Sequence, residues 1–293
     1  MDLKNKLKKN ILNQSITNPQ SYFYRMYKDS DRNQFYKDII ESNVKDRVVL
    51  EVGAGIGLLS VLSANAGAKH VYALEANKDV FELAKKVIKE NQVEDKVTLI
   101  HSNSYEFIDT EILDKVEVVV HELFSTNFFG ESVLPILKDL KKKLSQNVVF
   151  LPEKANINLV GVKKVKDDKP SNLIAGVKIN IWDELTQFDS SNIVWDESLK
   201  VNTEKETLFS FDFNGNIAAS NTYVLKSDYS ENSDYLCQYF ELIHDDKKLS
   251  NLKHDASLFA NHWGVSLYTI HLKEKNIKAT YSLNEFKFEK IKS

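Results

Sequence analysis

The sequence has a single cysteine, Cys237, among 293 residues. A disulfide within the chain is therefore excluded, and a cysteine-based metal site is disfavoured, so we expect no metal. Chains that do not depend on disulfides are typical of reducing compartments. We therefore expect an intracellular, cytoplasmic protein.

The sequence also lacks any apolar run long enough to cross a bilayer. Its first residues, MDLKNKLKKNILNQS, are basic but have no apolar core of the kind found in secretory signals, so we expect a solvated helix or a frayed end there. The net charge of −3 disfavours a nucleic-acid partner, which usually needs a basic surface. We expect a globular chain that binds neither a membrane nor a nucleic acid.

Strand and helix signals alternate between residues 46 and 152. Such alternation predicts right-handed crossovers and a parallel sheet, that is, an α/β domain. We predict strands at 47–52, 70–74, 96–101 and 116–120, and helices at 58–66, 77–91 and 132–144.

The regions on either side of this α/β domain have different patterns. Residues 1–45 carry apolar positions at roughly helical spacing, and we expect a helical segment there. Residues 153–293 carry strand-like segments at short intervals, which predict a second, antiparallel β-rich domain. The predicted strands are 156–162, 206–213, 221–225, 235–241, 265–272 and 279–283.

A glycine-rich turn, Gly53-Ala54-Gly55-Ile56-Gly57, follows the first predicted strand. It differs from the dinucleotide fingerprint because Leu58 stands where that motif needs its third glycine. Glu75 ends the next strand, where a carboxylate can accept hydrogen bonds from both hydroxyls of a ribose. Three alternating glycines with this glutamate form the usual pattern of enzymes that bind S-adenosylmethionine, so we predict that cofactor.

Two glutamates, Glu122 and Glu131, lie in the loop HELFSTNFFGE after the predicted strand 116–120. Ligands of open parallel sheets bind outside the carboxyl ends of the strands, so we expect the loop and the glycine turn to border one crevice. Two carboxylates that face one site repel each other unless a cation lies between them. A planar guanidinium with several donors fits such a pair.

Four separated blocks of this sequence resemble the protein arginine N-methyltransferase family. The blocks are the double-glutamate loop, the glycine motif with Glu75, the stretch 26–33 followed by Tyr36, and Asn261-His262-Trp263. The resemblance spans residues 22 to about 270 and is greatest to the monomethylating, type III branch. It implies a Rossmann-like cofactor domain at 46–152, a β-barrel substrate domain at 153–293, and residues 1–45 folded over the cofactor.

The resemblance also implies roles for single residues. It suggests that Arg32 clamps the cofactor carboxylate, that Met26 shapes the transfer cavity, and that Asp29 and His262 form a base pair. The alternative for His262 is packing between the two domains. Glu106 is expected at the adenine amino group, or else as a surface residue where a helix starts. Trp263, Tyr22 and Phe124 are assigned to the substrate side, although Trp263 is also compatible with ordinary core packing, and we interpret His121 as a strand-end histidine satisfied by backbone.

Two residues depart from the family pattern. Ser125 stands where the type III branch often has an acidic residue, and Asn261 replaces the usual threonine or aspartate. These departures leave the number of methyl groups added and the substrate sequence preference open.

The residues predict an arginine N-methyltransferase that acts on a protein or peptide and releases S-adenosylhomocysteine. In a second hypothesis the chemistry is the same, but the enzyme methylates free arginine or another guanidino metabolite, since no appended recognition domain is evident. A non-catalytic cofactor-binding scaffold and a methyltransferase for a different nucleophile are also compatible with the expected fold. The family resemblance also favours a homodimer.

Overall fold

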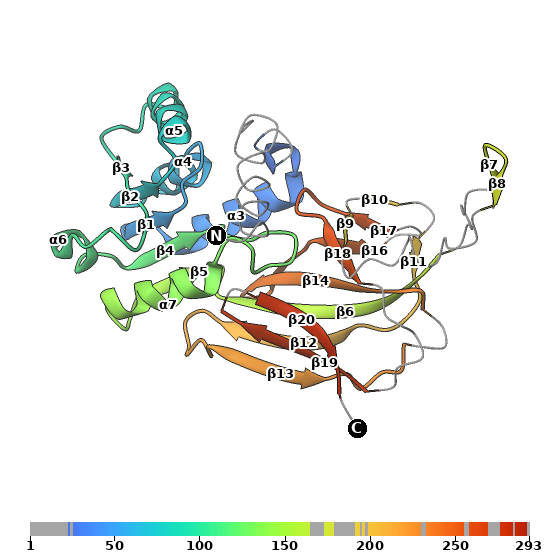
Figure 1. The fold of residues 1–293 in the computed structure, drawn as a ribbon. Coiled ribbons are helices and arrows are strands. Elements are labelled where there is room, and N and C mark those ends of the chain that lie inside the picture. The colour runs from blue at the N-terminus through green and yellow to red at the C-terminus, as the bar shows by residue number, and fades with distance from the viewer. Residues whose placement is uncertain are drawn as a thin grey trace, which may run out of the picture. The chain divides into compact units, whose positions relative to one another are not determined.

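The computed structural model describes residues 23, 26–164, 173–178, 191–193, 195–196, 199–229, 233–254, 258–268, 276–283 and 285–291 (Figure 1). The chain divides into two compact units, and each is described by itself. The first contains residues 1–107 and 116–120, and the second contains residues 108–115 and 121–293. The expected domain boundary at residue 152 stays a prediction.

The first unit is built on strands in the order β3-β2-β1-β4, of which β1 pairs in parallel with β2 and β2 with β3. Their bounds are Val97–His101 (β3), His70–Glu75 (β2), Val48–Val52 (β1) and Val118–His121 (β4), whose last residue belongs to the second unit. Val52 pairs with Leu74, and Glu75 pairs with His101. Every residue of β1 is buried, as expected for a central strand covered on both faces.

The helices in the described part of the first unit are α3 (Ser30–Asn43), α4 (Leu58–Asn65) and α5 (Lys78–Glu90). Helix α5 begins after Asn77, whose side chain accepts hydrogen bonds from the amides of Asp79 and Val80. It buries Val80, Ala84 and Ile88, which share one face at a spacing of four residues. Helices α4 and α5 contact strands β2 and β3.

The second unit begins with short elements: α6 (Thr110–Leu113), α7 (Val133–Lys143) and β5 (Val149–Leu151). Helix α7 buries Val133, Leu134, Leu137 and Leu140 and carries three lysines in its last turn, where cations suit the helix dipole.

The main sheet of the second unit is antiparallel and has the order β11-β6-β14-β18-β9, with β12 paired to β6 and β15 paired to β14 (Figure 1). Its strands are β6 (Lys154–Lys164), β9 (Ser191–Ile193), β11 (Leu199–Val201), β12 (Glu206–Asp212), β14 (Tyr235–His244), β15 (Lys247–Ser250) and β18 (Val265–Tyr268). Strands β6 and β14 pair from Lys154 to Val162. Their side chains Val160, Val162, Cys237 and Tyr239 form one core with Leu252 and Leu267.

Smaller sheets complete the described part of the second unit. Their orders are β10-β17-β16, β13-β19-β20 and β7-β8. The strands are β7 (Leu173–Ile174), β8 (Val177–Lys178), β10 (Trp195–Asp196), β13 (Ser220–Val224), β16 (Leu252–His254), β17 (Leu258–Ala260), β19 (Ile277–Ser282) and β20 (Glu285–Lys290).

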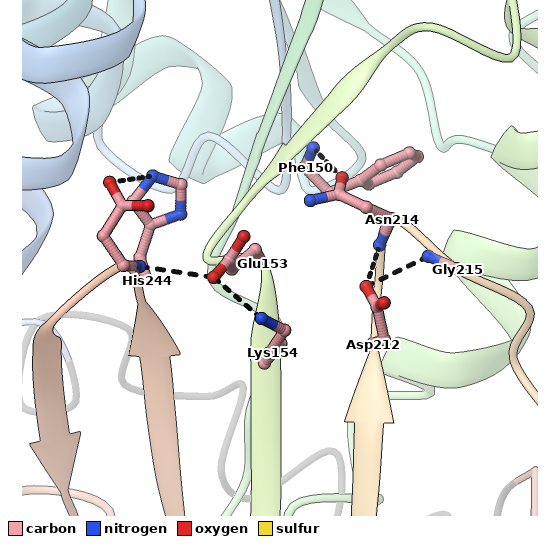
Figure 2. A network of polar contacts seen from close by, with 8 residues as sticks. Phe150, Glu153, Lys154, Asp212, Asn214, Gly215 and His244 are labelled. Carbon is pink, nitrogen blue, oxygen red and sulfur yellow. Dashed lines mark hydrogen bonds and ion pairs between the residues drawn. The ribbon is translucent and has the colours of Figure 1, made fainter.

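Polar contacts tie the chain after β5 to the strands of the second unit (Figure 2). Asn214 Oδ1 accepts a hydrogen bond from the amide of Phe150 at 2.8 Å, and the amide of Asn214 donates to Asp212 Oδ1 at 2.9 Å. Glu153 Oε1 accepts from the amide of Asp245 at 3.2 Å and lies 3.2 Å from Lys154 Nζ. These contacts fix where β6 starts relative to β12 and β14.

The expected α/β half and β-rich half are both confirmed. Each predicted helix and strand between 46 and 152 is present, with ends shifted by at most two residues. The structure also has strands that were not predicted: β5, β7 to β11, β15 to β17 and β20. Apart from β20 they have two to four residues, too few to show an alternating pattern. In β20, Phe286 and Phe288 do alternate with charged residues, so this strand was missed although its signal is present. Among the described residues, no helix is both long and apolar enough to span a membrane.

Candidate functional site

The glycine turn of the first unit joins β1 to α4 with three left-handed residues. Gly53, Gly55 and Gly57 have φ angles of 74°, 57° and 87°. The amides of Gly53 and Ala54 both donate to the carbonyl of Leu74, at 3.0 and 2.9 Å, which fastens the turn to the end of β2. A Cβ added at Gly55 would lie 3.2 Å from the ring of Phe23, so this position is crowded as well as left-handed.

Glu75 lies at the end of β2 and holds the glycine turn through its side chain. Its Oε2 accepts from the amide of Gly55 at 2.9 Å, and its Oε1 accepts from the amide of Asn77 at 2.7 Å. Burial raises the pKa of this carboxyl, and the backbone amides oppose that rise. Each oxygen keeps a second lone pair, so the carboxylate can still accept ribose hydroxyls.

The segment before α3 is organised by its own polar residues. Asp29 Oδ1 accepts from the amide of Arg32 at 3.1 Å and caps α3. Asn33 accepts from Arg32 Nη1 at 3.0 Å and donates to the carbonyl of Tyr27 at 2.8 Å. Arg32 is 2% exposed and its guanidinium lies 5.2 Å from the ring centre of Tyr36. Met26 is also buried.

Glu51, in β1 just before the glycine turn, was not identified from the sequence. Its side chain is 1% exposed, and Ser60 of α4 donates a hydrogen bond to its Oε2. Burial raises the pKa of Glu51 to about 8, against the opposing effects of Ser60 and the Arg32 charge. The carboxyl is therefore largely protonated at neutral pH. An acidic residue in an apolar strand was the available signal, but burial could not be read from it.

In the second unit, Glu122 directly follows β4 and is half-buried. Trp263 Nε1 donates a hydrogen bond to Glu122 Oε1 at 3.2 Å. Trp263 is buried, and its ring lies 5.2 Å from that of Phe240. The indole Nε1–H therefore holds a loop glutamate, a contact that the assignment of Trp263 to the substrate side did not include.

The loop after Glu122 is anchored by aromatic side chains. Phe124 is fully buried, and its ring centre lies 5.3 Å from that of Phe128 and 5.7 Å from that of Phe240. His121 lies 5.6 Å from Phe124, and burial lowers its pKa to about 3. His121 is therefore neutral at neutral pH. The contact of Phe124 with substrate stays a prediction.

Glu131 lies near the far end of the same loop and is exposed. Two non-glycine residues close to it have left-handed backbones: Phe128 with a φ of 72° and Ser132 with a φ of 61°. Such residues are uncommon and cost about 1–3 kcal/mol each, and they concentrate at ligand sites. The path of this loop is therefore held by its surroundings.

The turn that presents Trp263 is fixed by two buried asparagines. Asn261 Oδ1 accepts from the amide of Trp263 at 3.2 Å, a turn that threonine or aspartate can also form. Asn251 Oδ1 accepts from the amide of Phe240 at 2.7 Å, and its Nδ2 donates to the carbonyl of Gly264 at 2.6 Å. Asn251 was missed because nothing in its sequence neighbourhood distinguishes it from a surface turn residue.

The remaining predicted site residues stand as follows. His262 is half-buried and its ring lies 4.2 Å from that of Trp263. Glu106 is exposed after β3. Tyr22 lies outside the described residues. The pairing of His262 with Asp29 joins different units and stays a prediction, as does the shared crevice of glycine turn and loop.

Comparisons with known proteins indicate a methyltransferase relationship. A family model described as the TRM5/TYW2 methyltransferase domain matches residues 23–142. The chain is 34% identical over 174 residues to protein arginine N-methyltransferase 1 of Chlamydomonas reinhardtii, a match covering 57% of this chain and 47% of the relative. The chain thus spans about half the length of the curated relatives it matches.

Solved structures share the fold. The structure described as the Trypanosoma brucei PRMT1 enzyme-prozyme heterotetrameric complex with AdoHcy matches with a TM-score of 0.69 and 21% identity, covering 89% of this chain and 86% of that one. A crystal structure of PRMT6 matches with a TM-score of 0.70 and 17% identity, covering 92% and 98%. At these identities the matches establish the fold alone.

Proposed function

We propose that this chain, a homologue of the protein arginine N-methyltransferases, methylates arginine with S-adenosylmethionine. The cofactor, when bound, supplies a methyl group on a sulfonium. The glycine turn, Glu75 and Arg32 would hold it: the turn lets a ligand approach the backbone, and Glu75 keeps lone pairs for ribose hydroxyls. Arg32 has the charge to bind a carboxylate.

The observation that carries the proposal is the hydrogen bond from Trp263 to Glu122. A free guanidinium has a pKa above about 12, stays protonated and is a poor nucleophile. A carboxylate held in one orientation can localise the positive charge on some nitrogens and leave one richer in electrons. We infer that Glu122 and Glu131 grip the guanidinium in this way.

The reaction we propose is an in-line displacement. A guanidinium nitrogen forms a bond to the methyl carbon, the carbon–sulfur bond breaks, and its electron pair returns to sulfur, leaving S-adenosylhomocysteine. Holding the nitrogen in line can lower the barrier by several kcal/mol, up to roughly 7–11 in favourable cases. The methylated nitrogen then loses one proton, so the guanidinium product keeps its single positive charge.

His262, backed by Asp29, is our proposed acceptor for that proton. The carboxylate of Asp29 already caps α3, and further acceptor sites on its oxygens are compatible with the second role. Solvent can also take the proton after transfer. A His262→Gln variant with a shifted pH–rate profile would support the base, whereas an unshifted profile would exclude it.

We further propose a single methylation, because the segment 26–33 resembles the monomethylating branch most. The contacts of Asn33 with Arg32 and Tyr27 give this segment a defined shape. A protein or peptide arginine is the proposed substrate, and a homodimer in the cytoplasm is the proposed setting. Monomethylarginine as the only product would support the branch, and dimethylarginine would exclude it.

The test compares Glu122→Gln and Glu131→Gln with the parent, using an arginine-glycine-rich peptide and free arginine in separate arms. We expect each variant to lose methyl transfer, by roughly a hundredfold, while calorimetry shows unchanged cofactor affinity. Mass spectrometry counts the methyl groups and identifies the accepted substrate. Parent-like transfer by both variants would contradict the proposal.

Glu204→Gln is the matched control, because Glu204 is an exposed carboxylate of the same unit outside the loop. It should leave transfer unchanged. A parent protein that binds the cofactor but methylates neither peptide nor arginine would favour another nucleophile. Absence of cofactor binding would favour a non-catalytic scaffold.

A further inference from the structure

The loop between Glu122 and Glu131 is closed by two short polar side chains. Ser125 Oγ donates a hydrogen bond to Asn127 Oδ1 at 2.8 Å and accepts one from the amide of Gly130 at 2.7 Å. Asn127 Oδ1 also accepts from the amides of Phe129, at 3.2 Å, and Gly130, at 3.1 Å. We call this pair of side chains the Ser125–Asn127 clasp.

The clasp leaves no room for a side chain at Gly130. A Cβ added there would lie 2.5 Å from Ser125 Oγ and 2.9 Å from Ser125 Cβ, closer than real Cβ contacts. A glycine directly before Glu131 is therefore required by the clasp itself. This gives the glycine of the double-glutamate loop a physical role in this chain.

The clasp fixes the backbone where Glu131 begins. On its N-terminal side, the amide of Phe128 donates to the carbonyl of Ser125 at 2.8 Å, and the Phe128 ring is fully buried. On its C-terminal side, Ser132 starts α7 with a left-handed backbone. Glu131 thus lies between two constrained points while its own side chain is exposed.

The hydrogen bonds of the clasp suit the serine that this chain has at position 125, where the type III branch often has an acidic residue. A serine hydroxyl can donate to Asn127 Oδ1 and accept from Gly130 at the same time. A carboxylate at 125 could accept from Gly130, but it would place negative oxygens against Asn127 Oδ1. Ser125 and Asn127 are therefore chemically matched to each other.

We propose that Ser125 and Asn127 are positioning residues that aim Glu131 at the guanidinium. The inference rests on the proposed arginine methylation and adds two residues to it. Neither side chain needs to touch the substrate. They hold the Gly130 amide in place. The backbone at Gly130 in turn sets the direction in which the Glu131 side chain extends.

The experiment compares Ser125→Ala, Asn127→Ala, Ser125→Asp and Ser125→Thr with the parent. We expect the first three to lower kcat for the arginine peptide by roughly ten- to hundredfold, the range expected when a reacting group is misplaced, with unchanged cofactor affinity. Ser125→Thr keeps the hydroxyl and should retain most of the parent kcat. Parent-like kcat in both alanine variants would overturn the proposal.

Thr203→Val is the matched control. Thr203 Oγ1 accepts from the amide of Gly161 at 2.7 Å, the same kind of contact in the same unit outside this loop. This variant should lower Tm by an amount similar to Ser125→Ala while kcat stays at the parent value. If Thr203→Val and Ser125→Ala lost kcat equally, the clasp would only stabilise the fold, and the positioning role would be overturned.

Amide exchange at Gly130 gives a readout that does not depend on activity. The clasp predicts a protected amide in the parent and fast exchange in folded Asn127→Ala. Slow exchange in that variant would overturn the clasp. A parent that exchanges slowly but methylates no arginine would instead refute the proposed function, and the positioning role with it, while leaving the clasp itself intact.

Discussion

Trp263 and Glu122, 141 positions apart in the chain, are joined by a hydrogen bond from the indole Nε1 to the carboxylate Oε1 at 3.2 Å. Trp263 is buried against Phe240, so its ring cannot easily follow the carboxylate if that group rotates. One oxygen of Glu122 is therefore held in place. The backbone of Trp263 is itself held by Asn261, and Asn251 accepts a hydrogen bond from the amide of Phe240 in the β-rich core.

Trp263→Phe should lower arginine methylation while leaving the fold intact. The change keeps an aromatic ring but removes the donor to Glu122. A hydrogen bond to a charged group contributes about 1.5–3 kcal/mol, so we expect kcat/KM to fall by roughly ten- to hundredfold. Tyr268→Phe is the control, because it also removes an aromatic donor, here to Gln238 at 3.4 Å. Similar losses in both variants would refute the special role of Trp263.

Gly55→Ala should weaken cofactor binding. The new Cβ would have a left-handed backbone and would lie 3.2 Å from Phe23. Gly176→Ala is a matched control, since Gly176 has a φ of 82° but no atom within 4 Å of the added Cβ. Both changes should cost about 1 kcal/mol of stability, but only the first should raise the Kd measured by calorimetry. An unchanged Kd in Gly55→Ala would contradict the assignment of this turn.

Glu51 should make the protein less stable as the pH rises. Its pKa is raised from 4.5 to about 8 in the folded protein. Between these values the folded state holds more protons than the unfolded chain, so the free energy of unfolding falls by at most about 1.4 kcal/mol per pH unit. Glu51→Gln does not titrate.

The stability advantage of Glu51→Gln over the parent should therefore grow from about pH 5 to about pH 8 and then level off. Ser60 lowers the pKa of Glu51, so Ser60→Ala should extend the window to higher pH. Chemical denaturation at several pH values measures both effects. Parallel profiles for Glu51→Gln and the parent would show that this carboxyl does not titrate as described.

Asn251→Ala should destabilise the second unit. The change leaves the Phe240 amide and the Gly264 carbonyl without the partners that Asn251 supplies. Each loss costs about 1–3 kcal/mol, so the free energy of unfolding should fall by about 2–6 kcal/mol. Asn251→Asp keeps the acceptor and should show an intermediate loss. Equal stability of all three proteins in urea would contradict this role.

Much of the fold could be predicted from local sequence patterns. Two elements can each be recognised within one short window: the largely apolar strand before Gly53, and the helix that buries Val80, Ala84 and Ile88 at a spacing of four residues. The glycine turn and the order of strands and helices follow from the same local signals. The shortest strands could not be predicted, because two to four residues are too few to show an alternating pattern.

The sequence by itself determined which residues can do the chemistry: three alternating glycines, Glu75, and a loop with two glutamates. Only the structure decided what constrains the two glutamates, namely the hydrogen bond from Trp263 to Glu122 and the Ser125–Asn127 clasp before Glu131, and only the structure revealed the buried Glu51. The reason is that a residue's type sets what bonds it can form, whereas burial and distance decide which bonds form. Both depend on strand register and turn geometry that no short stretch of sequence contains.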